Sequence, residues 1–269
     1  MAGDGLEMPR LGFGTWGRTG PEGVEAMLAA LEAGCRHLDT AQGYDTERET
    51  GEAVRRSGLP REEVFVTTKV AEGNLGEVVP SLRRSLDALR MDRVDLALIH
   101  WPAREGGPAL ETYLTALAEA QREGLARRIG VSNFTVALLD EALEILGPGS
   151  ILTNQVELNP LFRNCKLADH CAARGVLVTC YEPIARGRVA EDATIRRVSQ
   201  SHGATPVQVA LAWELAKGWA AIPTSSKRER IAENMAAADL RLTAEEVEAL
   251  DGLDRGQRSI DPDWAPDWD

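Results

Sequence analysis

The sequence repeats one arrangement along its whole length: a short apolar run typical of a buried strand, followed by a segment with helical spacing of apolar residues. Among the clearest runs are VFVTTKV at 64–70, VDLALIH at 94–100 and VLVTCY at 176–181. Strands that alternate with helices form parallel sheets, and eight such units in about 250 residues are typical of a (β/α)8 barrel. We therefore predict an α/β fold, a (β/α)8 TIM barrel, as a single domain over residues 1–269.

The same pattern gives approximate bounds for each unit. Strands are expected at residues 10–15, 35–40, 64–70, 94–100, 127–132, 151–158, 176–181 and 219–225. Helices are expected at 24–34, 47–57, 75–90, 109–124, 136–146, 166–175, 192–202, 206–217 and 228–237, with an additional one at 243–253. Thr243 is expected to cap the additional helix, and Pro206 suits the first position of its helix.

A glycine pattern near the start of the chain suggests a different fold. Residues 12–17 read Gly-Phe-Gly-Thr-Trp-Gly, which matches G-x-G-x-x-G, and Asp39 follows about 20 residues later, as in a dinucleotide-binding motif. That motif must follow an apolar strand, but LEMPRL at 6–11 contains a proline and charged residues. The bulky Trp16 would also lie where the backbone has to approach a pyrophosphate. We therefore interpret the segment as the first strand of the barrel.

Polar side chains that suit one reaction lie at the ends of three predicted strands. Asp39 ends the second strand, Lys69 the third and His100 the fourth, and Tyr44 follows Asp39 after one turn. The carboxyl ends of the strands form the active-site face of a (β/α)8 barrel. Each residue alone would be explained by loop capping or packing, but their occurrence together at corresponding positions indicates an active site.

These four side chains could together support the reduction of a carbonyl group. A carbonyl that accepts hydride needs a proton on its oxygen, and Tyr44 could supply it if its pKa, about 10 in water, were lowered. The Lys69 ammonium would lower that pKa by stabilising the phenolate, and Asp39 would keep Lys69 charged and oriented. His100 would donate an N–H that orients and polarises the carbonyl.

Motifs distributed over the whole chain also indicate an enzyme that reduces carbonyl groups. In order they are GFGTW, LDTAQGYDTE, TTKV, LIHWP, GVSNF, NQVELNP and an IPTSS segment followed by Glu233 and Asn234. Together they resemble the aldo-keto reductase superfamily over essentially the entire chain. The resemblance implies a (β/α)8 barrel, an NADPH-dependent oxidoreductase that reduces aldehydes and ketones, and a catalytic set of Tyr44, Asp39, Lys69 and His100.

The resemblance also implies a site for NADPH, with NADH as the alternative cofactor. Amide and hydroxyl groups at the ends of strands five and six would bind the nicotinamide carboxamide, and Tyr181 would stack on the ring. A basic cluster at a helix start would bind the 2′-phosphate, although Thr224 stands where many relatives have lysine, and Glu182 replaces a usually small residue. The expected cofactor residues are Thr15, Trp16, Ser132, Asn133, Gln155, Tyr181, Pro183, Ile184, Ser225, Ser226, Lys227, Arg228, Arg230, Glu233 and Asn234.

Tryptophans mark the expected substrate pocket. Trp16 and Trp101 follow strand ends beside the proposed chemistry, whereas Trp264 and Trp268 lie on the C-terminal tail, which in relatives folds over the barrel mouth. The expected substrate residues are Trp16, Tyr44, His100, Trp101 and Trp264. We expect small aldehydes, α-dicarbonyls such as methylglyoxal, or keto-sugars such as 2,5-diketo-D-gluconate as substrates.

Composition restricts the partners and the location. The net charge of −12 argues against nucleic acid and anionic membrane as partners. No apolar run approaches the roughly 18 residues of a membrane span, and residues 1–10 lack the apolar core of a signal peptide. The chain is expected to be a cytoplasmic monomer that acts on a small carbonyl compound. Its cysteines show no metal-binding spacing and are interpreted as reduced thiols: Cys35, Cys165, Cys171 and Cys180.

Other functions stay open at this point. Within enzymes, the chain could be an NADH-preferring or alcohol-oxidising relative; outside them, it could be a non-catalytic, redox-sensing binding subunit, as some relatives are. A metal-dependent barrel hydrolase would need several histidine or carboxylate ligands at strand ends. However, His37 lies at a strand start, and His170 and His202 lie in predicted helices. No metal site is therefore expected.

Overall fold

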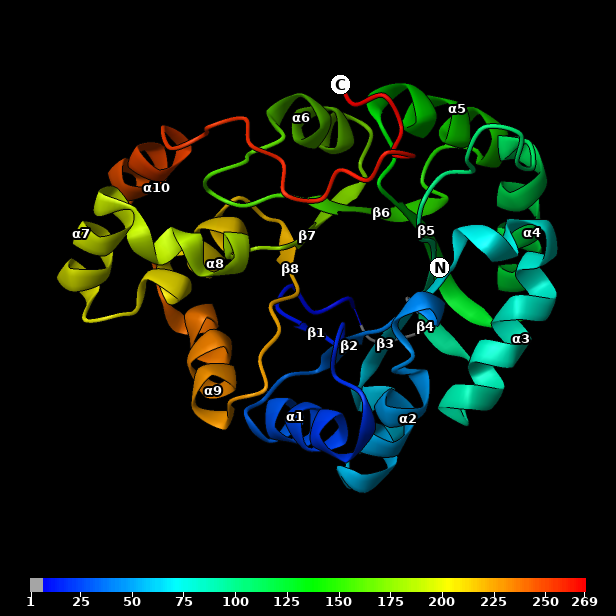
Figure 1. Ribbon diagram of the computed structural model, residues 1–269, viewed down its shortest axis with the longest axis horizontal. Coiled ribbons are helices and arrows are strands. Elements are labelled where there is room, and N and C mark those ends of the chain that lie inside the picture. The colour runs from blue at the N-terminus through cyan, green and yellow to red at the C-terminus, as the bar shows by residue number, and fades with distance from the viewer. Residues whose placement is uncertain (1–6) are drawn as a thin grey trace.

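The computed structural model of the chain describes residues 7–269, so the expectation about a signal peptide, which rests mainly on residues 1–6, lies outside it. Eight parallel strands form one sheet in the order β1 to β8, and helices surround it (Figure 1). The predicted (β/α)8 barrel is confirmed. The strands are β1 (Phe13–Gly14), β2 (His37–Asp39), β3 (Phe65–Val70), β4 (Val94–Ile99), β5 (Ala126–Ser132), β6 (Ile151–Glu157), β7 (Leu177–Tyr181) and β8 (Ala220–Ala221).

The first and last strands close the barrel although each is shorter than predicted. The backbone N–H of Gly12 donates to the carbonyl oxygen of Ala221 at 2.9 Å, and the N–H of Ala221 donates to that of Arg10 at 2.7 Å. A Cβ atom at Gly14 would lie 2.8 Å from the carbonyl oxygen of Ile222, so only glycine permits this approach. Gly14 thus permits barrel closure, and the dinucleotide-binding fold is excluded.

The helices lie close to their predicted positions. The helix predicted at 24–34 begins four residues earlier, at Gly20, and ends at Glu32. The helix predicted at 75–90 begins as a 3-10 helix and becomes an α-helix only at Val78. Pro80 explains this boundary, since proline lacks an N–H donor and is tolerated only in the first turn. The α-helices are α1 (Gly20–Glu32), α2 (Glu47–Arg56), α3 (Val78–Leu89), α4 (Leu110–Arg122), α5 (Val136–Leu146), α6 (Cys165–Ala173), α7 (Ala193–His202), α8 (Pro206–Ala216), α9 (Arg228–Ala236) and α10 (Ala244–Asp251). The 3-10 helices are η1 (Gln42–Tyr44), η2 (Arg61–Glu63), η3 (Glu72–Glu77), η4 (Ala185–Glu191) and η5 (Ala237–Asp239).

Capping boxes define the starts of two of these helices. Thr243 caps α10, as predicted, and exchanges hydrogen bonds with Glu246 in a capping box. Thr205 and Gln208 form the same arrangement at α8, where Pro206 occupies the first turn. In each case the side chains satisfy backbone N–H groups that have no partner within the helix.

The alternation of side chains along the strands builds the active-site face layer by layer. In β3, Val66 and Val70 point outward and pack in the core beneath the helices. Phe65 points inward and belongs to the apolar floor of the barrel. Two residues later, Thr67 bonds the Nε2 atom of His37 at 2.9 Å. Two residues later again, Lys69 reaches the carboxyl end of the barrel, as the period of two requires.

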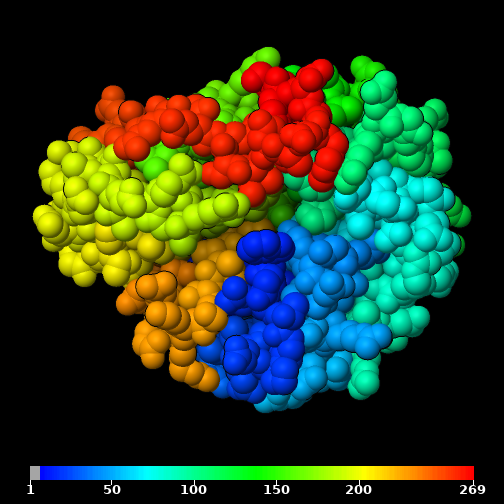
Figure 2. Space-filling view, in the orientation of Figure 1, coloured from blue at the N-terminus to red at the C-terminus, as the bar shows by residue number. Residues whose placement is uncertain are grey.

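The segment after α10 crosses the carboxyl end of the barrel (Figure 1). Its last part, red in Figure 2, covers one side of this face and leaves a hollow beside it. The Glu157 carboxylate accepts hydrogen bonds from the backbone N–H groups of Ser259 and Ile260, each at 2.8 Å. The Asp269 carboxylate accepts another from the N–H of Val136, at the start of α5, at 2.9 Å. These bonds hold the tail over the mouth, where it was expected.

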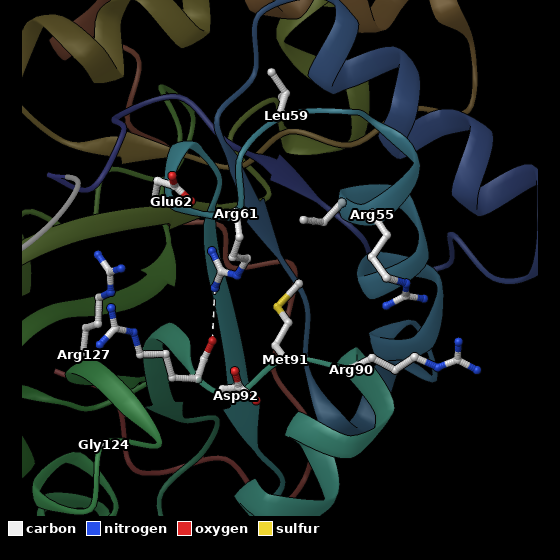
Figure 3. A pocket seen from close by; sticks show the side chains of 11 residues that line it. Arg55, Leu59, Arg61, Glu62, Arg90, Met91, Asp92, Gly124 and Arg127 are labelled. Carbon is white, nitrogen blue, oxygen red and sulfur yellow. Dashed lines mark hydrogen bonds between the residues drawn. The ribbon is translucent and has the colours of Figure 1, made fainter.

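A second hollow, of about 730 Å³, lies at the opposite, amino end of the barrel (Figure 3). Within it, Arg61 donates to the Asp95 carboxylate at 2.8 Å and to the carbonyl oxygen of Arg93 at 3.1 Å. Arg55 and Arg90 lie at the carboxyl ends of α2 and α3, where guanidinium groups complement the helix dipole. We interpret these contacts as stabilising the barrel, since chemistry in such barrels takes place at the carboxyl end of the strands.

None of the helices in residues 7–269 is long and apolar enough to cross a membrane.

Candidate active site

The barrel brings the four predicted catalytic side chains together at its carboxyl end. Asp39 is the last residue of β2, Lys69 lies near the end of β3, and His100 directly follows β4. Tyr44 ends the 3-10 helix η1, which carries the chain away from β2. Asp39 and Lys69 are almost fully buried, whereas Tyr44 and His100 are partly exposed. The two partly exposed groups are therefore the ones that an incoming substrate can reach.

The Lys69 ammonium contacts more groups of the site than its neighbours do and lies between Asp39 and Tyr44. It donates hydrogen bonds to the Asp39 carboxylate, to the carbonyl oxygen of Thr40 at 3.0 Å and to the Tyr44 hydroxyl at 3.3 Å. The second oxygen of Asp39 accepts a hydrogen bond from the side-chain amide of Gln155 at 2.8 Å. Each buried charge thus has the partners that an ion pair out of water requires.

The charge state of this pair follows from two opposing effects. Burial lowers the pKa of Lys69, but the carboxylate of Asp39 and the Tyr44 hydroxyl raise it by more, so the pKa lies above its ordinary value. Lys69 is therefore a cation over the whole neutral range. Its positive charge is directed at the oxygen of Tyr44.

The pKa of Tyr44 differs from the sequence-based expectation. Burial raises this pKa, and Lys69 opposes the rise. In the protein without cofactor or substrate, the pKa of the Tyr44 phenol therefore lies above its ordinary value. The expected effect of Lys69 is present, but burial outweighs it. The phenol is consequently protonated at neutral pH, the state that a proton donor needs, and Lys69 stabilises the phenolate formed when the proton leaves.

His100 is placed against the same hydroxyl. Its Nε2 atom lies 3.4 Å from the Tyr44 oxygen, and the two rings meet edge to face with centroids 5.3 Å apart. Burial, assisted by the nearby Lys69 charge, lowers the pKa of His100 to about 3. The imidazole is therefore neutral and can donate one N–H to a carbonyl oxygen without competing as an acid.

Four of the expected cofactor residues form a continuous network beside this group. Asn133 accepts a hydrogen bond from the Tyr181 hydroxyl at 2.8 Å and donates to the carbonyl oxygen of His100 at 3.0 Å. It also donates to the Ser132 hydroxyl at 3.1 Å, which in turn donates to the carbonyl oxygen of Gln155 at 2.8 Å. The network links the ends of β5, β6 and β7 to His100, the predicted catalytic histidine.

Two other expected cofactor residues, at the end of β1, have different surroundings. Thr15 is buried, and its hydroxyl bonds that of Thr46 at 2.9 Å. Thr46 also bonds the hydroxyl of Thr40 at 2.9 Å, so Thr15 supports the loop that carries Tyr44. Trp16, in contrast, is 65% exposed in the turn that follows β1.

The segment after β7 begins with an unusual backbone. Glu182 has a φ of 50° and Ala185 a φ of 47°, both in the left-handed region that favours glycine. The expected cofactor residues Pro183 and Ile184 lie between them. Glu182 also pairs with Arg186 at 3.2 Å. The larger side chain that replaces the usual small residue thus forms a local ion pair in this loop.

The expected phosphate-binding segment lies between β8 and α9. Ser225, Ser226, Lys227 and Arg230 are at least partly exposed there, whereas Arg228 pairs with Glu32 at 2.5 Å. The buried hydroxyl of Thr224 has no hydrogen-bond partner within residues 7–269. This orphaned group and the free N–H groups at the start of α9 suit a phosphorylated ligand. Glu233 is exposed and Asn234 is buried, both on α9.

Aromatic side chains form a wall on one side of the mouth. Trp101 follows His100 and is 8% exposed, because two tail residues cover it. The ring of Trp264 lies edge to face with it at a centroid distance of 5.0 Å, and the ring of Trp268 lies at 6.0 Å. The structure thus brings Trp101 and Trp264 together, whereas the exposed Trp16 belongs to no such contact in the described residues.

Three residues that lie at this face were not identified from the sequence. Thr40 accepts a hydrogen bond from Lys69 through its backbone, which leaves no mark in the side-chain pattern. Glu157 could have been noticed, since a carboxylate within the apolar strand NQVEL must have buried partners. Arg258 lies on the irregular tail, where no periodicity predicts which side chain points toward the barrel.

The remaining histidines are engaged elsewhere. His170 bonds Asp140 and His202 bonds Glu246, each at 2.9 Å. In the part of the chain from residue 7 onward, no group of three or more histidine, cysteine, aspartate or glutamate side chains is arranged to hold a metal ion. These contacts give no support to the metal-dependent hydrolase that was considered.

Comparison with known proteins agrees with the site. The model of the aldo/keto reductase family matches residues 10–255. Methylglyoxal reductase DkgB of Salmonella typhi is 42% identical over 267 residues, which cover 98% of this chain and 100% of that protein. An aldo-keto reductase of Mycobacterium avium (strain 104) is 40% identical over 259 residues, covering 96% of this chain and 90% of that protein.

Solved structures give the same result. A candidate 2,5-diketo-D-gluconic acid reductase B is 38% identical and superposes with a TM-score of 0.93, covering 97% of this chain and 94% of that one. MGS-M4, an aldo-keto reductase from a deep-sea metagenome library, is 31% identical with a TM-score of 0.90, covering 97% and 96%. The expected resemblance of the chain to 2,5-diketo-D-gluconate reductase B is confirmed by these matches.

Proposed function

The chain belongs to the aldo/keto reductase family, and from that membership we propose that it reduces small aldehydes and α-dicarbonyl compounds with NADPH as hydride donor. Keto-sugars related to 2,5-diketo-D-gluconate are the second substrate class. The observation that carries the proposal is the position of the Tyr44 hydroxyl, 3.3 Å from the Lys69 ammonium and 3.4 Å from Nε2 of His100. This is a phenol between a cation that stabilises its anion and a neutral donor that can hold a carbonyl oxygen.

Each residue has one part in the reaction. NADPH, when bound, supplies the hydride to the carbonyl carbon. His100 donates a hydrogen bond to the carbonyl oxygen and fixes its direction toward Tyr44. Tyr44 transfers its proton to that oxygen, and Lys69 stabilises the phenolate left behind because its charge is held in place by Asp39. The high pKa of the free phenol keeps the proton available until the substrate carries developing negative charge.

The choice of NADPH rests on the segment between β8 and α9. The 2′-phosphate that distinguishes NADPH from NADH needs positive charge and hydrogen-bond donors. Lys227 and Arg230 have no ion-pair partner in the described residues, and the Thr224 hydroxyl is buried without a hydrogen bond. Arg228, however, is already paired with Glu32. We therefore expect a moderate preference for NADPH rather than an absolute one.

The substrate class follows from the relatives and from the mouth of the barrel. One relative is a methylglyoxal reductase, and one structural neighbour is a candidate 2,5-diketo-D-gluconic acid reductase B. Both names describe compact polar carbonyl compounds. The wall of Trp101, Trp264 and Trp268 narrows one side of the mouth, which suits compounds of that size.

A steady-state assay tests the proposal directly. Methylglyoxal is offered with NADPH and, separately, with NADH, and the oxidation of the cofactor is followed by absorbance. We expect turnover with both and a lower Michaelis constant for NADPH. Absence of turnover with either cofactor, over a panel that includes glyceraldehyde and 2,5-diketo-D-gluconate, would favour the non-catalytic redox-sensing subunit. A lower Michaelis constant for NADH would overturn the cofactor assignment alone.

A further inference from the structure

Each of the two tail tryptophans stacks with an arginine. Within the described residues, one of these two arginines has an ion-pair partner and the other has none. The guanidinium carbon of Arg104 lies 4.0 Å from the ring centre of Trp264, and its Nη2 atom pairs with Glu72 at 2.8 Å. The guanidinium carbon of Arg258 lies 3.5 Å from the ring centre of Trp268. Within residues 7–269, Arg258 has neither a hydrogen bond nor an ion pair, and its Nη1 atom is buried without a partner.

Arg258 lies at the same end of the barrel as the proposed chemistry. Trp268 connects it to Trp101, the neighbour of His100, at a centroid distance of 6.0 Å. Stacking therefore connects this guanidinium, through Trp268 and Trp101, to the segment that carries His100.

Stacking leaves the donors of the guanidinium available. A guanidinium group that lies on aromatic faces, here Trp268 and Phe162 at 4.7 Å, keeps its N–H groups free in its own plane. A planar guanidinium that is fixed in this way can donate two parallel hydrogen bonds to the two oxygens of a carboxylate. The side chain is only partly buried, so part of this edge stays accessible.

The nearby carboxylates do not occupy these donors. Glu157 accepts from the N–H groups of Ser259 and Ile260, and Asp261 accepts from the indole of Trp268 at 2.8 Å. Asp269 accepts from the N–H of Val136. Each of these groups already has a donor, and none approaches Arg258 within ion-pair distance in the described residues.

From this arrangement we propose that Arg258 binds the carboxylate of the substrate, so that the enzyme favours carbonyl compounds that carry an acid group some atoms away from the reacting carbonyl. The inference rests on the proposed carbonyl reduction. It deepens that function by naming keto acids and aldehyde acids as the preferred class.

The test compares two benzaldehydes of similar size, one neutral and one anionic: 4-nitrobenzaldehyde and 4-carboxybenzaldehyde. The quantity measured is the ratio of kcat/KM for the carboxylate to kcat/KM for the nitro compound. In Arg258→Met this ratio is expected to fall about tenfold or more, because the variant loses a charge-assisted hydrogen bond to the carboxylate. Arg258→Lys, which keeps the charge but not the fork, is expected to recover part of it.

Arg104→Met is the matched control, because it removes the same kind of stacked guanidinium from the neighbouring tryptophan. Any effect of this variant is expected to fall on both aldehydes alike and leave the ratio unchanged. A ratio in Arg258→Met within twofold of the wild type, or an equal fall in Arg104→Met, would overturn the inference.

A binding measurement separates this inference from the proposed function. Benzoate is titrated into the NADP⁺-saturated protein, and binding is followed by quenching of tryptophan fluorescence. Benzoate is expected to bind the wild type about tenfold more tightly than Arg258→Met. Equal affinities would contradict the role of Arg258 even if both aldehydes are reduced. Absence of reduction with a retained difference in affinity would contradict only the proposed function.

Discussion

At the scale of single residues, most of the site depends on Lys69. Replacing it in Lys69→Met removes the cation that stabilises the Tyr44 phenolate and leaves the Asp39 carboxylate buried with one remaining side-chain donor, Gln155. We expect loss of reductase activity and a fall of about 3–5 kcal/mol in the free energy of unfolding, measured in urea.

Two further variants sharpen this measurement. Lys166→Met, at a lysine whose side chain is 71% exposed, is expected to leave the unfolding free energy within about 0.5 kcal/mol of the wild type. The double variant Asp39→Asn/Lys69→Met should recover part of the lost stability, since no charge is then left unpaired. An unchanged unfolding midpoint in Lys69→Met would show that the ion pair is unimportant for the fold.

His100 is expected to orient the substrate rather than supply the proton. Its pKa of about 3 keeps the ring neutral, so its contribution is a hydrogen bond from an N–H group. His100→Gln retains such a donor and is expected to keep part of kcat/KM for methylglyoxal, whereas His100→Ala is expected to lose about tenfold to a hundredfold more. Equal values in the two variants would contradict an orienting role.

Glu214 gives a prediction about pH. It lies on α8, is fully buried, and neither of its carboxylate oxygens has a partner in residues 7–269. Burial raises its pKa well above the ordinary value. In the unfolded chain the Glu214 carboxyl ionises near pH 4.5. Below that pH its contribution to stability is complete. As the pH rises toward the folded-state pKa, the contribution is lost by up to about 1.4 kcal/mol per pH unit.

The variant Glu214→Gln removes this titration. Its unfolding free energy, relative to that of the wild type, is expected to increase between pH 4.5 and pH 8. The control is Glu248→Gln, the same substitution at an exposed position of α10. If the difference between Glu214→Gln and the wild type is the same at both pH values, Glu214 does not titrate as the structure implies.

At the scale of elements, Glu157 attaches the tail to the end of β6. Glu157→Ala removes the acceptor for the N–H groups of Ser259 and Ile260. Amide hydrogen exchange is expected to become faster at residues 255–269 and to stay unchanged in the strands, because the bonds lost belong to the tail alone. The Michaelis constant for methylglyoxal should rise as the mouth loses its wall.

Glu144→Ala, at an exposed position of α5, serves as the control and should alter neither property. If hydrogen exchange in the tail is the same in Glu157→Ala as in the wild type, the two backbone bonds do not hold it.

Some elements of this fold are determined by local sequence pattern, and others are not. The helix at 136–146 was predicted without error because its apolar spacing and the cap at Thr135 are both local. β1 and β8 were predicted several residues too long, since strand length depends on which backbone groups find a partner across the closure. Asp39, Lys69 and His100 were predictable because a strand end is visible in the sequence.

Other features of the site depend on the fold as a whole. The direction of the Tyr44 pKa required knowledge of its burial, which competes with the local effect of Lys69. Glu157 and Arg258 acquire their roles only because the tail returns across residues about one hundred positions earlier in the chain, as the bond between Ser259 and Glu157 shows. No periodicity in the tail encodes that path.

At the scale of the whole molecule, the barrel separates stability from chemistry. Its amino end holds two guanidinium groups, of Arg61 and Arg127, paired with the Asp95 carboxylate. Its carboxyl end holds the buried ion pair beneath a partly exposed phenol. The central claim is that this phenol, Tyr44, gives its proton to the carbonyl oxygen.

The most direct test is the rate of a single turnover of NADPH and methylglyoxal in Tyr44→Phe, with NADPH affinity measured on the same protein. The ring still packs beside Lys69, so affinity for NADPH is expected to be nearly unchanged, whereas the single-turnover rate is expected to fall by about 10²–10⁴-fold. Tyr113→Phe, at a buried tyrosine that bonds the N–H of Ala103, controls for loss of a phenol and should retain the wild-type rate. A single-turnover rate close to that of the wild type in Tyr44→Phe would contradict the account.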